Sequence, residues 1–372
     1  MASATGDNRL VVLQTCLADY GVPFFERLVA ALPGTSVLCG REYFTPHVVQ
    51  GPERVVWRSP LRNRFLLGRS LLWQSGAIGG GGGAGVLIAE FNPRILTTWL
   101  VLVLRTIAGK PTLLWGHVWG HRAPASLGRS VRLAMLRLSS GMLCYSQREA
   151  DELRRALPDY PVWAAPNSCV TESMCQAGPS SGADCVVYVG RLIANKKPQL
   201  LVDAFARALD RLPAGARLVL VGDGEQRIEL ERRVGELGLS SRVEMPGHIA
   251  SDAALREIYD RAIVAVSPGY VGLSAVQCMA AGVPMIVSRD EPHSPEIEAC
   301  LEGETCVFFE TNSTESLSDA IVACFAQRAA WDSRRPRIAS FIRQRYTLEG
   351  MVRAFEAAVA AVAAAPSHPR TV

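Results

Sequence analysis

A short apolar segment runs into a glycine and three basic residues just ahead of an amphipathic segment, and this arrangement could bind a diphosphate. It spans Val186 to Phe205, and its glycine and cations are Gly190, Arg191, Lys196 and Lys197. Backbone N–H groups and the dipole at a helix N-terminus favour an anion. An arginine offers a planar pair of donors to phosphate oxygens, and a lysine adds a point charge. The alternative is a strand, loop and helix with ordinary surface cations.

The elements that would position these cations belong to a chain long enough for two domains. Its 372 residues exceed one ordinary compact domain. A hydrophobic fraction of 49% with 20% charged residues suits a globular protein with sizeable cores. The formal net charge of +4 is far from the strongly basic balance of a nucleic-acid-binding domain. The ten cysteines include no CxxC pair, which favours buried reduced thiols over a disulfide framework or a zinc site.

Strand-like and helix-like segments alternate in the first half of the chain. Strands are expected over 9–16, 35–40, 85–91, 111–117 and 141–146, and helices over 23–32, 126–140 and 146–157. The pentaglycine Gly79 to Gly83 predicts a flexible loop. The apolar segment Ile95 to Ala108 is too short to span a bilayer and is interrupted by Arg105, so we expect a buried helix there.

The alternation restarts after a polar segment rich in glycine and serine, residues 176–183, which predicts a linker. Further strands are expected over 186–190, 217–222, 242–247, 262–268 and 284–288. Strands separated by helices imply parallel sheets covered on both faces. We therefore expect an α/β protein with doubly wound domains over 1–175 and 184–346. A C-terminal helix and tail, 347–372, would pack back toward the first domain, and ligands would bind in a cleft outside the carboxyl ends of the strands.

Four motifs of the second domain resemble those of a known family. GRLIANK, LVLVGDGE, VEMPGHI and SPGYVGLSAVQCMAAGVPMI occur in this order. Together they resemble the donor half of the retaining GT-B glycosyltransferases of family 4, also called group 1. In the first domain, LQTCLADYGVPFFERLVAAL and LLWGH resemble the opening and the histidine-bearing loop of bacterial members that build surface polysaccharides. The resemblance implies two Rossmann-like domains facing across a cleft, the first on the acceptor side and the second binding a nucleotide sugar.

The resemblance also implies roles for individual residues. Arg191 and Lys196 would hold the donor pyrophosphate and neutralise the charge that grows on the leaving group. His117 would contact the transferred sugar or orient the acceptor, unless it is a hydrogen-bonded structural histidine. The other donor-binding residues would be Gly190, Gly222, Asp223, Gly224, Gly247, His248, Ile249, Gly272, Leu273, Ser274 and Gln277.

One motif departs from the family pattern. The family carries two glutamates with seven residues between them, and the matching positions here are Gly269 and Gln277. The Gln277 amide can still donate to or accept from a ribose hydroxyl, but Gly269 has no side chain to contact the sugar. Glu296 or Glu298 would contact the sugar instead, or the enzyme is weakened or inactive; we favour the first explanation.

No metal ion and no cofactor are expected. His117 and His121 have a spacing that can bind zinc on a helix, but neither an HExxH glutamate nor a cysteine pair accompanies them. A DxD-like carboxylate cluster is also absent, and Arg191 with Lys196 would supply the charge that a divalent ion supplies elsewhere. The chain lacks a GxGxxG dinucleotide fingerprint, so the nucleotide-diphosphate sugar is expected as substrate only.

The expected location is cytoplasmic. The N-terminal segment lacks the basic start, apolar core and cleavage site of a secretory signal. The arginine-rich segment Arg122 to Arg137 could rest on anionic lipid at the inner membrane face, or it is a solvated helix packed on its domain. Contact with the membrane would be peripheral and would make a lipid-linked acceptor plausible beside a sugar acceptor.

These observations predict a retaining, metal-independent hexosyltransferase. It would move a sugar from a nucleotide-diphosphate donor to an acceptor hydroxyl in cell-surface polysaccharide or glycolipid synthesis, with no nucleic-acid partner. The absent glutamates would also fit a catalytically silent partner protein that binds a nucleotide sugar. A nucleotide-sugar epimerase or a phosphorylase is a third hypothesis. The epimerase would need more carboxylates or histidines for proton transfer, and a pyridoxal-dependent phosphorylase would need a Schiff-base lysine.

Overall fold

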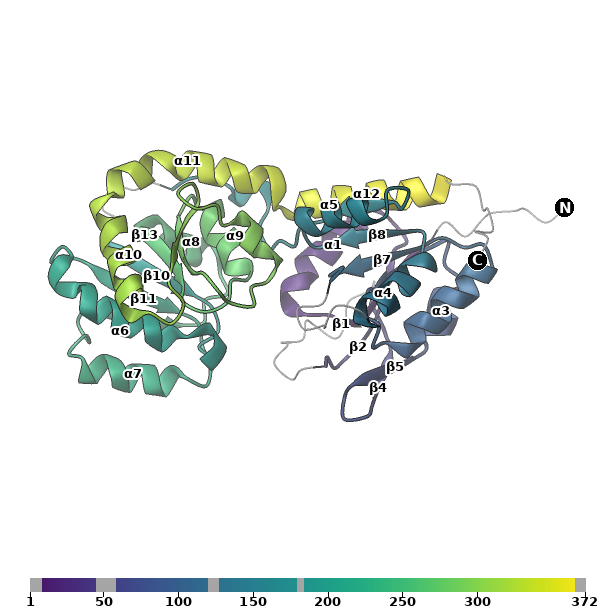
Figure 1. Ribbon diagram of the computed structural model, residues 1–372, viewed down its shortest axis with the longest axis horizontal. Coiled ribbons are helices and arrows are strands. Elements are labelled where there is room, and N and C mark those ends of the chain that lie inside the picture. Colours follow the sequence, from purple (N-terminus) through teal and green to yellow (C-terminus); the bar gives the residue numbers. More distant parts are fainter. Residues whose placement is uncertain (1–8, 45–57, 120–126, 179–183, 365–372) are drawn as a thin grey trace. The chain divides into compact units, whose positions relative to one another are not determined.

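The structure is a computed structural model that describes residues 9–44, 58–119, 127–178 and 184–364. The chain divides into two compact units, shown in Figure 1. Unit 1 comprises Met1–Cys169 and Leu348–Val372, and unit 2 comprises Val170–Thr347. The division therefore falls before the segment rich in glycine and serine, not within it.

Unit 1 is built on a seven-stranded parallel sheet with the order β3-β2-β1-β6-β7-β8-β9. Its strands are β1 (Leu10–Cys16), β2 (Ser36–Gly40), β3 (Arg58–Pro60), β6 (Val86–Glu90), β7 (Thr112–Gly116), β8 (Gly141–Cys144) and β9 (Val162–Ala164). A separate antiparallel hairpin joins β4 (Arg62–Leu66) to β5 (Leu71–Ser75).

Helices cover both faces of this sheet. On one face lie α1 (Val22–Ala31) and the C-terminal α12 (Leu348–Ala364), whose rings Phe24 and Phe355 pack on Trp115 of β7. The other face carries α2 (Ala77–Gly82), α3 (Leu96–Ile107), α4 (Leu127–Arg137) and α5 (Gln147–Ala156). The last helix of the chain thus belongs to unit 1, although it follows unit 2 in sequence.

The pentaglycine segment corrects the sequence-based expectation of a loop, because most of it lies in α2. Arg105 reaches this helix from α3, and its Nη1 donates to the carbonyls of Gly81 at 3.0 Å and Ala84 at 2.8 Å. Lys110 adds two bonds of 3.3 Å to neighbouring carbonyls. Cations favour the C-terminal end of a helix, so these two side chains offset the poor helix propensity of glycine.

The expectation of a buried helix at α3 is also wrong in part. One face is buried and contains Val101 and Leu102, but the other face is exposed. Arg105 interrupts the apolar segment because it faces inward, toward α2 and Thr112, where its Nε donates to the threonine hydroxyl at 2.9 Å. Burial lowers the pKa of Arg105 to about 10.

Unit 2 contains a six-stranded parallel sheet with the order β12-β11-β10-β13-β14-β15. Its strands are β10 (Cys185–Val189), β11 (Arg217–Val221), β12 (Val243–Gly247), β13 (Ala262–Ser267), β14 (Met285–Ser288) and β15 (Cys306–Phe309). One face is covered by α6 (Pro198–Ala208), α7 (Arg227–Glu236) and α10 (Thr314–Ala326), and the other by α8 (Asp252–Arg261), α9 (Leu273–Ala280) and α11 (Arg328–Arg345). The expected α/β class with two doubly wound domains is confirmed.

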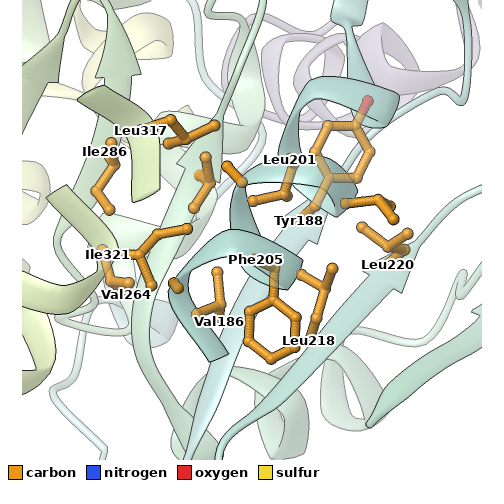
Figure 2. Close-up of a cluster of buried hydrophobic side chains, with 14 of the residues drawn as sticks. Val186, Tyr188, Leu201, Phe205, Leu218, Leu220, Val264, Ile286, Leu317 and Ile321 are labelled. Atoms are coloured by element: carbon orange, nitrogen blue, oxygen red, sulfur yellow. The ribbon is translucent and has the colours of Figure 1, made fainter. Parts of the chain in front are cut away.

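The central strand β10 is buried on both faces. Val186 and Tyr188 pack against Leu201 and Phe205 of α6, as Figure 2 shows, while Val187 is fully buried on the opposite face. Successive side chains of a strand point to opposite faces. A central parallel strand therefore appears in sequence as an unbroken apolar segment, and this strand carries the cationic turn to the edge of the sheet.

All ten cysteines lie in the described part of the chain, and none of them forms a disulfide. Most are buried, and burial raises the thiol pKa values of Cys185 and Cys324 to about 12. Within residues 9–364, apart from the gaps given above, no helix has both the length and the apolar content that a bilayer span requires.

Candidate functional site

Three turns at the carboxyl edge of the unit 2 sheet lie against one another. The N–H of Gly190 donates to Val221 O at 3.0 Å, and the N–H of Gly222 donates to Gly247 O at 2.9 Å. Gly222 has φ +138°, and a Cβ on it would lie 1.9 Å from Gly190 O. Only glycine fits such a position. The three predicted glycines therefore meet where ligands bind in open α/β sheets.

The turn after β11 continues this contact. The N–H of Leu192 donates to Asp223 O at 2.8 Å, and a Cβ on Gly224 would lie 2.4 Å from Leu192 O. The Asp223 carboxylate is exposed and accepts from the N–H of Gly224 at 2.7 Å. The predicted GDG motif is thus a close-packed backbone turn beside the cationic segment.

The two predicted cations meet at Tyr270, in the loop that follows β13. Lys196 Nζ donates to Tyr270 O at 2.8 Å and lies 3.5 Å from the centre of the tyrosine ring. Arg191 Nη2 donates to the Tyr270 hydroxyl at 3.2 Å. Tyr270 is not among the residues predicted from the sequence, although it lies inside the motif SPGYVGLS.

The charge of Lys196 depends strongly on its surroundings. The pKa of Lys196 is lowered to about 7, mainly because burial disfavours the charged form and secondly because Arg191 lies near it. Glu296, which is 3% exposed, acts in the opposite direction. A bound anion would restore the lysine charge, so this group is poised to respond to a negatively charged ligand.

The loop carrying Tyr270 lies directly on the cationic segment. A Cβ on the buried Gly269 would be 2.3 Å from Asn195 O and 2.8 Å from Lys196 Cα. Gly272, the residue before α9, would place a Cβ 3.6 Å from Lys196 Nζ. The N-terminus of α9, formed by Leu273 and the residues after it, therefore lies beside the lysine, and both attract an anion. Ser274 lies in this first turn and is half-buried.

His293 fixes the same loop from the segment after β14. The N–H of Val271 donates to His293 Nδ1 at 3.0 Å, and the N–H of Ser294 donates to Val271 O at 3.1 Å. An accepting ring nitrogen requires a neutral imidazole, and burial lowers the pKa of His293 accordingly. Sequence reasoning considered this segment, PHSPEIE, only for its glutamates and missed the histidine.

Two charged residues near the motif lie outside this cluster. Lys197 Nζ pairs with Glu291 and donates to Asn312 Oδ1 at 2.6 Å, so it ties the start of α6 to the ends of β14 and β15. Glu298 lies near Tyr346, whose pKa is raised mainly by burial and secondly by this carboxylate. Of the two glutamates considered for sugar contact, Glu296 is the one whose charge acts on Lys196.

The remaining predicted donor residues are less closely connected to the cations. His248 is exposed and Ile249 half-buried, both just after β12. Gln277 lines a hollow of about 220 Å³ between α8 and α9, together with Met174, Asp252, Ala253, Leu255, Arg256, Tyr259, Ala280 and Ala281. The hollow lies within unit 2, and neither Arg191 nor Lys196 lines it.

His117 lies in unit 1, directly after β7. Its Nδ1 is 3.5 Å from Glu149 Oε1, and its ring meets Tyr145 edge-on at 4.9 Å. Glu149 also accepts from the N–H of Val118 at 3.1 Å, and Arg132 Nη1 donates to His117 O at 3.1 Å. The histidine is thus firmly oriented and partly accessible. His121 and Arg122 lie outside the described residues.

Within the described ranges, no three metal-ligating side chains of the His, Cys, Asp and Glu types gather into a possible metal site. The positive charge at the carboxyl edge of the unit 2 sheet comes from Arg191, from Lys196 when it is protonated, and from the start of α9. Such a group of donors can bind two neighbouring phosphates.

Comparison with known proteins finds a family model that matches part of unit 2. Residues 183–327 match the family model described as glycosyl transferases group 1. These residues include the three turns, both cations and the Tyr270 loop. The matched segment therefore coincides with the site in unit 2.

Individual relatives and structures support the same assignment. The chain is 28% identical to the Vi polysaccharide biosynthesis protein VipC/TviE of Salmonella typhi over 54% of its own length and 35% of that protein. It is 27% identical to the α-D-kanosaminyltransferase of Streptomyces kanamyceticus over 70% of each chain. Among solved structures, Anabaena Alr3699/HepE in complex with UDP aligns over 95% of this chain and 100% of that one, with a TM-score of 0.70 at 15% identity. The fold is therefore that of the GT-B glycosyltransferases.

Proposed function

Because residues 183–327 belong to the group 1 glycosyltransferases, we propose that the chain moves a sugar from a nucleotide-diphosphate donor to an acceptor hydroxyl, with retention at the anomeric carbon. The observation that carries the proposal is the pair Arg191 and Lys196, which converges on one point at the carboxyl edge of the matched domain. The departing nucleoside diphosphate gains negative charge in the transition state, and fixed cations stabilise that charge.

The residues around the pair have defined parts in this proposal. Arg191 and Lys196 grip the diphosphate, and the N–H groups at the start of α9 bind its oxygens. The glycine turns at 190, 222 and 247 let the nucleotide approach the backbone closely. This set supplies the charge without a divalent ion. Glu296 is the better candidate for the sugar contact, since it is the glutamate that acts on Lys196.

The comparisons support the class of donor and product without fixing either. The HepE structures contain UDP or UDP-glucose, which favours a UDP-sugar as the first donor to try. The Salmonella relative is a polysaccharide biosynthesis protein, which favours a cell-surface saccharide or glycolipid as acceptor. His117, held by Glu149 in unit 1, is the proposed contact on the acceptor side.

A catalytically silent, donor-binding partner protein is the second candidate, and Gly269 favours it. The family glutamate at this position would contact the sugar, but a Cβ here would meet backbone atoms at 2.3 Å and 2.8 Å. The loop therefore has no room for that side chain in its present conformation. Donor binding without turnover would be the signature of this second function.

The test is release of nucleoside diphosphate from a panel of nucleotide sugars, with sugar and lipid-linked acceptors. We expect turnover with one donor, and a loss of 100-fold or more, roughly what one electrostatic donor contributes to catalysis, in Arg191→Ala and in Lys196→Ala. Arg217→Ala is the matched control, because Arg217 starts β11 at the opposite edge of the same sheet. Normal rates in both site variants would refute the assigned roles, and binding without turnover by the wild type would favour the silent protein.

A further inference from the structure

The exposed face of α3 is apolar, whereas its buried face carries polar side chains. The exposed residues are Leu100, Val103, Leu104 and Ile107, with Leu104 exposed by 45% and Ile107 by 80%. They follow the i, i+3, i+4, i+7 spacing of a single helix face. The buried polar residues are Thr97, Thr98 and Arg105. A helix on the surface of a globular protein normally shows the reverse distribution, so this face is suited to a partner other than water.

The sequence that contains α3 and α4 has no acidic residue. No aspartate or glutamate occurs between Glu90 and Glu149, whereas the same stretch contains seven arginines and one lysine. Two of the arginines face inward: Arg105 binds the end of α2, and Arg132 binds the carbonyl of His117. Arg148, at the end of the stretch, pairs with Glu152 at 2.9 Å. Arg129 and Arg137 lie in the acid-free part, more than ten residues from the nearest aspartate or glutamate in sequence.

α4 brings part of this charge beside the apolar face. The hydroxyl of Thr106, in the last turn of α3, donates to Leu138 O just after α4 at 2.8 Å, so the two helices, both labelled in Figure 1, are neighbours. Arg129 and Arg137 are exposed on α4, and Val131 is exposed between them. The end of α4 that carries Arg137 therefore lies beside the end of the apolar stripe of α3, and Arg129 adds positive charge further along the same helix.

We propose that this face, made of the exposed stripe of α3 and the arginines of α4, docks on a bilayer that contains anionic lipid. The stripe would enter the boundary of the acyl chains, and Arg129 and Arg137 would bind phosphate headgroups. A second copy of the chain is a poor occupant, because self-association would bring two acid-free cationic faces together. The inference goes beyond the proposed transfer reaction and does not depend on it. It also moves the apolar contact from the arginine-rich segment to α3.

The experiment is sedimentation of the full-length protein with large unilamellar vesicles. Phosphatidylcholine vesicles are compared with vesicles that also contain phosphatidylglycerol, at low and at high salt. We expect binding to the anionic vesicles, and loss of most of it in high salt, which screens the headgroup attraction. Equal binding to both vesicle types, or none to either, would overturn the proposal.

Variants then separate the apolar contact from the charge. Leu104→Glu and Ile107→Glu should each lower the vesicle partition coefficient about tenfold. Each removes an aliphatic side chain that would be buried in the bilayer when the protein docks. Arg137→Glu should lower it on anionic vesicles only. Ile228→Glu is the matched control, because Ile228 is also 80% exposed but lies on α7 of unit 2.

Two further outcomes would contradict the inference. If Ile228→Glu weakened vesicle binding as much as Ile107→Glu, the α3 face would not be the contact. If the wild type were a dimer that Ile107→Glu converted to a monomer, a second copy would be the occupant. Thermal unfolding of each variant identifies any loss of binding that reflects unfolding, and a substitution of a side chain exposed by 80% should leave that temperature unchanged.

Discussion

Affinity for the donor should depend on pH through Lys196, because its pKa in the free protein is about 7. Burial and the neighbouring Arg191 lower this pKa, and a bound diphosphate would raise it again. The protonated lysine is the form that binds an anion. Donor affinity should therefore be greatest below pH 7 and fall as the pH rises above it. The sign would be opposite for a group whose neutral form binds.

The size of the effect follows from the titration. With a pKa of about 7, roughly nine-tenths of the lysine is charged at pH 6 and roughly one-tenth at pH 8. Affinity should then fall about tenfold between these values, or about 1.4 kcal/mol, when the pKa in the complex returns to the ordinary lysine range of about 10, well above pH 8. Binding should also take up about half a proton at pH 7 and about nine-tenths of one at pH 8.

Titration calorimetry in buffers of different ionisation enthalpy measures both quantities. The probe is a UDP-sugar, because each of its phosphates carries one ester and one anhydride bond and lacks the second ionisation near pH 6 that a terminal phosphate has. Lys196→Arg is the control, since arginine stays charged throughout this range, and its affinity should not change with pH. A wild-type affinity that is constant from pH 6 to pH 8, or an equal decline in Lys196→Arg, would refute the reasoning.

Three further predictions concern the support of the site and of unit 1. Gly269→Glu should lower the melting temperature by several degrees without raising turnover. The new Cβ would be forced against a backbone atom at 2.3 Å, and such overpacking costs about 1–3 kcal/mol. Gln277→Glu, the control, should leave the melting temperature nearly unchanged. His293→Leu removes the acceptor of the Val271 N–H, so it should speed hydrogen exchange of that amide and weaken donor binding, at a cost of about 1–3 kcal/mol. Arg105→Leu should destabilise the protein by about 3 kcal/mol or more in denaturant unfolding, because at least two buried carbonyls lose their donor; an unchanged unfolding midpoint would contradict the role given to this arginine.

Strands that are buried on one or both faces could be predicted from the sequence, because burial leaves a regular pattern of apolar residues. β10 and its glycine turn could be recognised because a central parallel strand is apolar throughout and the positive φ of Gly222 admits only glycine. The sequence failed at α2, since the bonds that stabilise a glycine-rich helix come from Arg105, about twenty residues away. It also failed at the solvent face of α3, because spacing alone does not say which of two faces packs on the sheet.

The candidate site shows the same division between local and distant contacts. The cations were predictable from their position between a strand and a helix, and Lys196 indeed ends the short helical turn that precedes α6. Tyr270 and His293 were not, because their contacts join segments 74 and 22 residues apart in sequence. Lys197, by contrast, is also a lysine and is adjacent to Lys196 in sequence, but it pairs with Glu291. Residue type and spacing alone could not separate the two lysines.

The absence of the family glutamate at position 269 accounts for the position of Tyr270. Since Gly269 has no side chain, the loop can lie on the backbone at Asn195 and Lys196, with less room than a Cβ needs. That close approach brings the next residue, Tyr270, over the lysine, where its ring and its carbonyl both contact Nζ. The ring helps to bury the lysine, and burial is the main cause of its low pKa. The departure from the family pattern therefore predicts a donor site that is sensitive to pH, and the calorimetric experiment tests that electrostatic consequence.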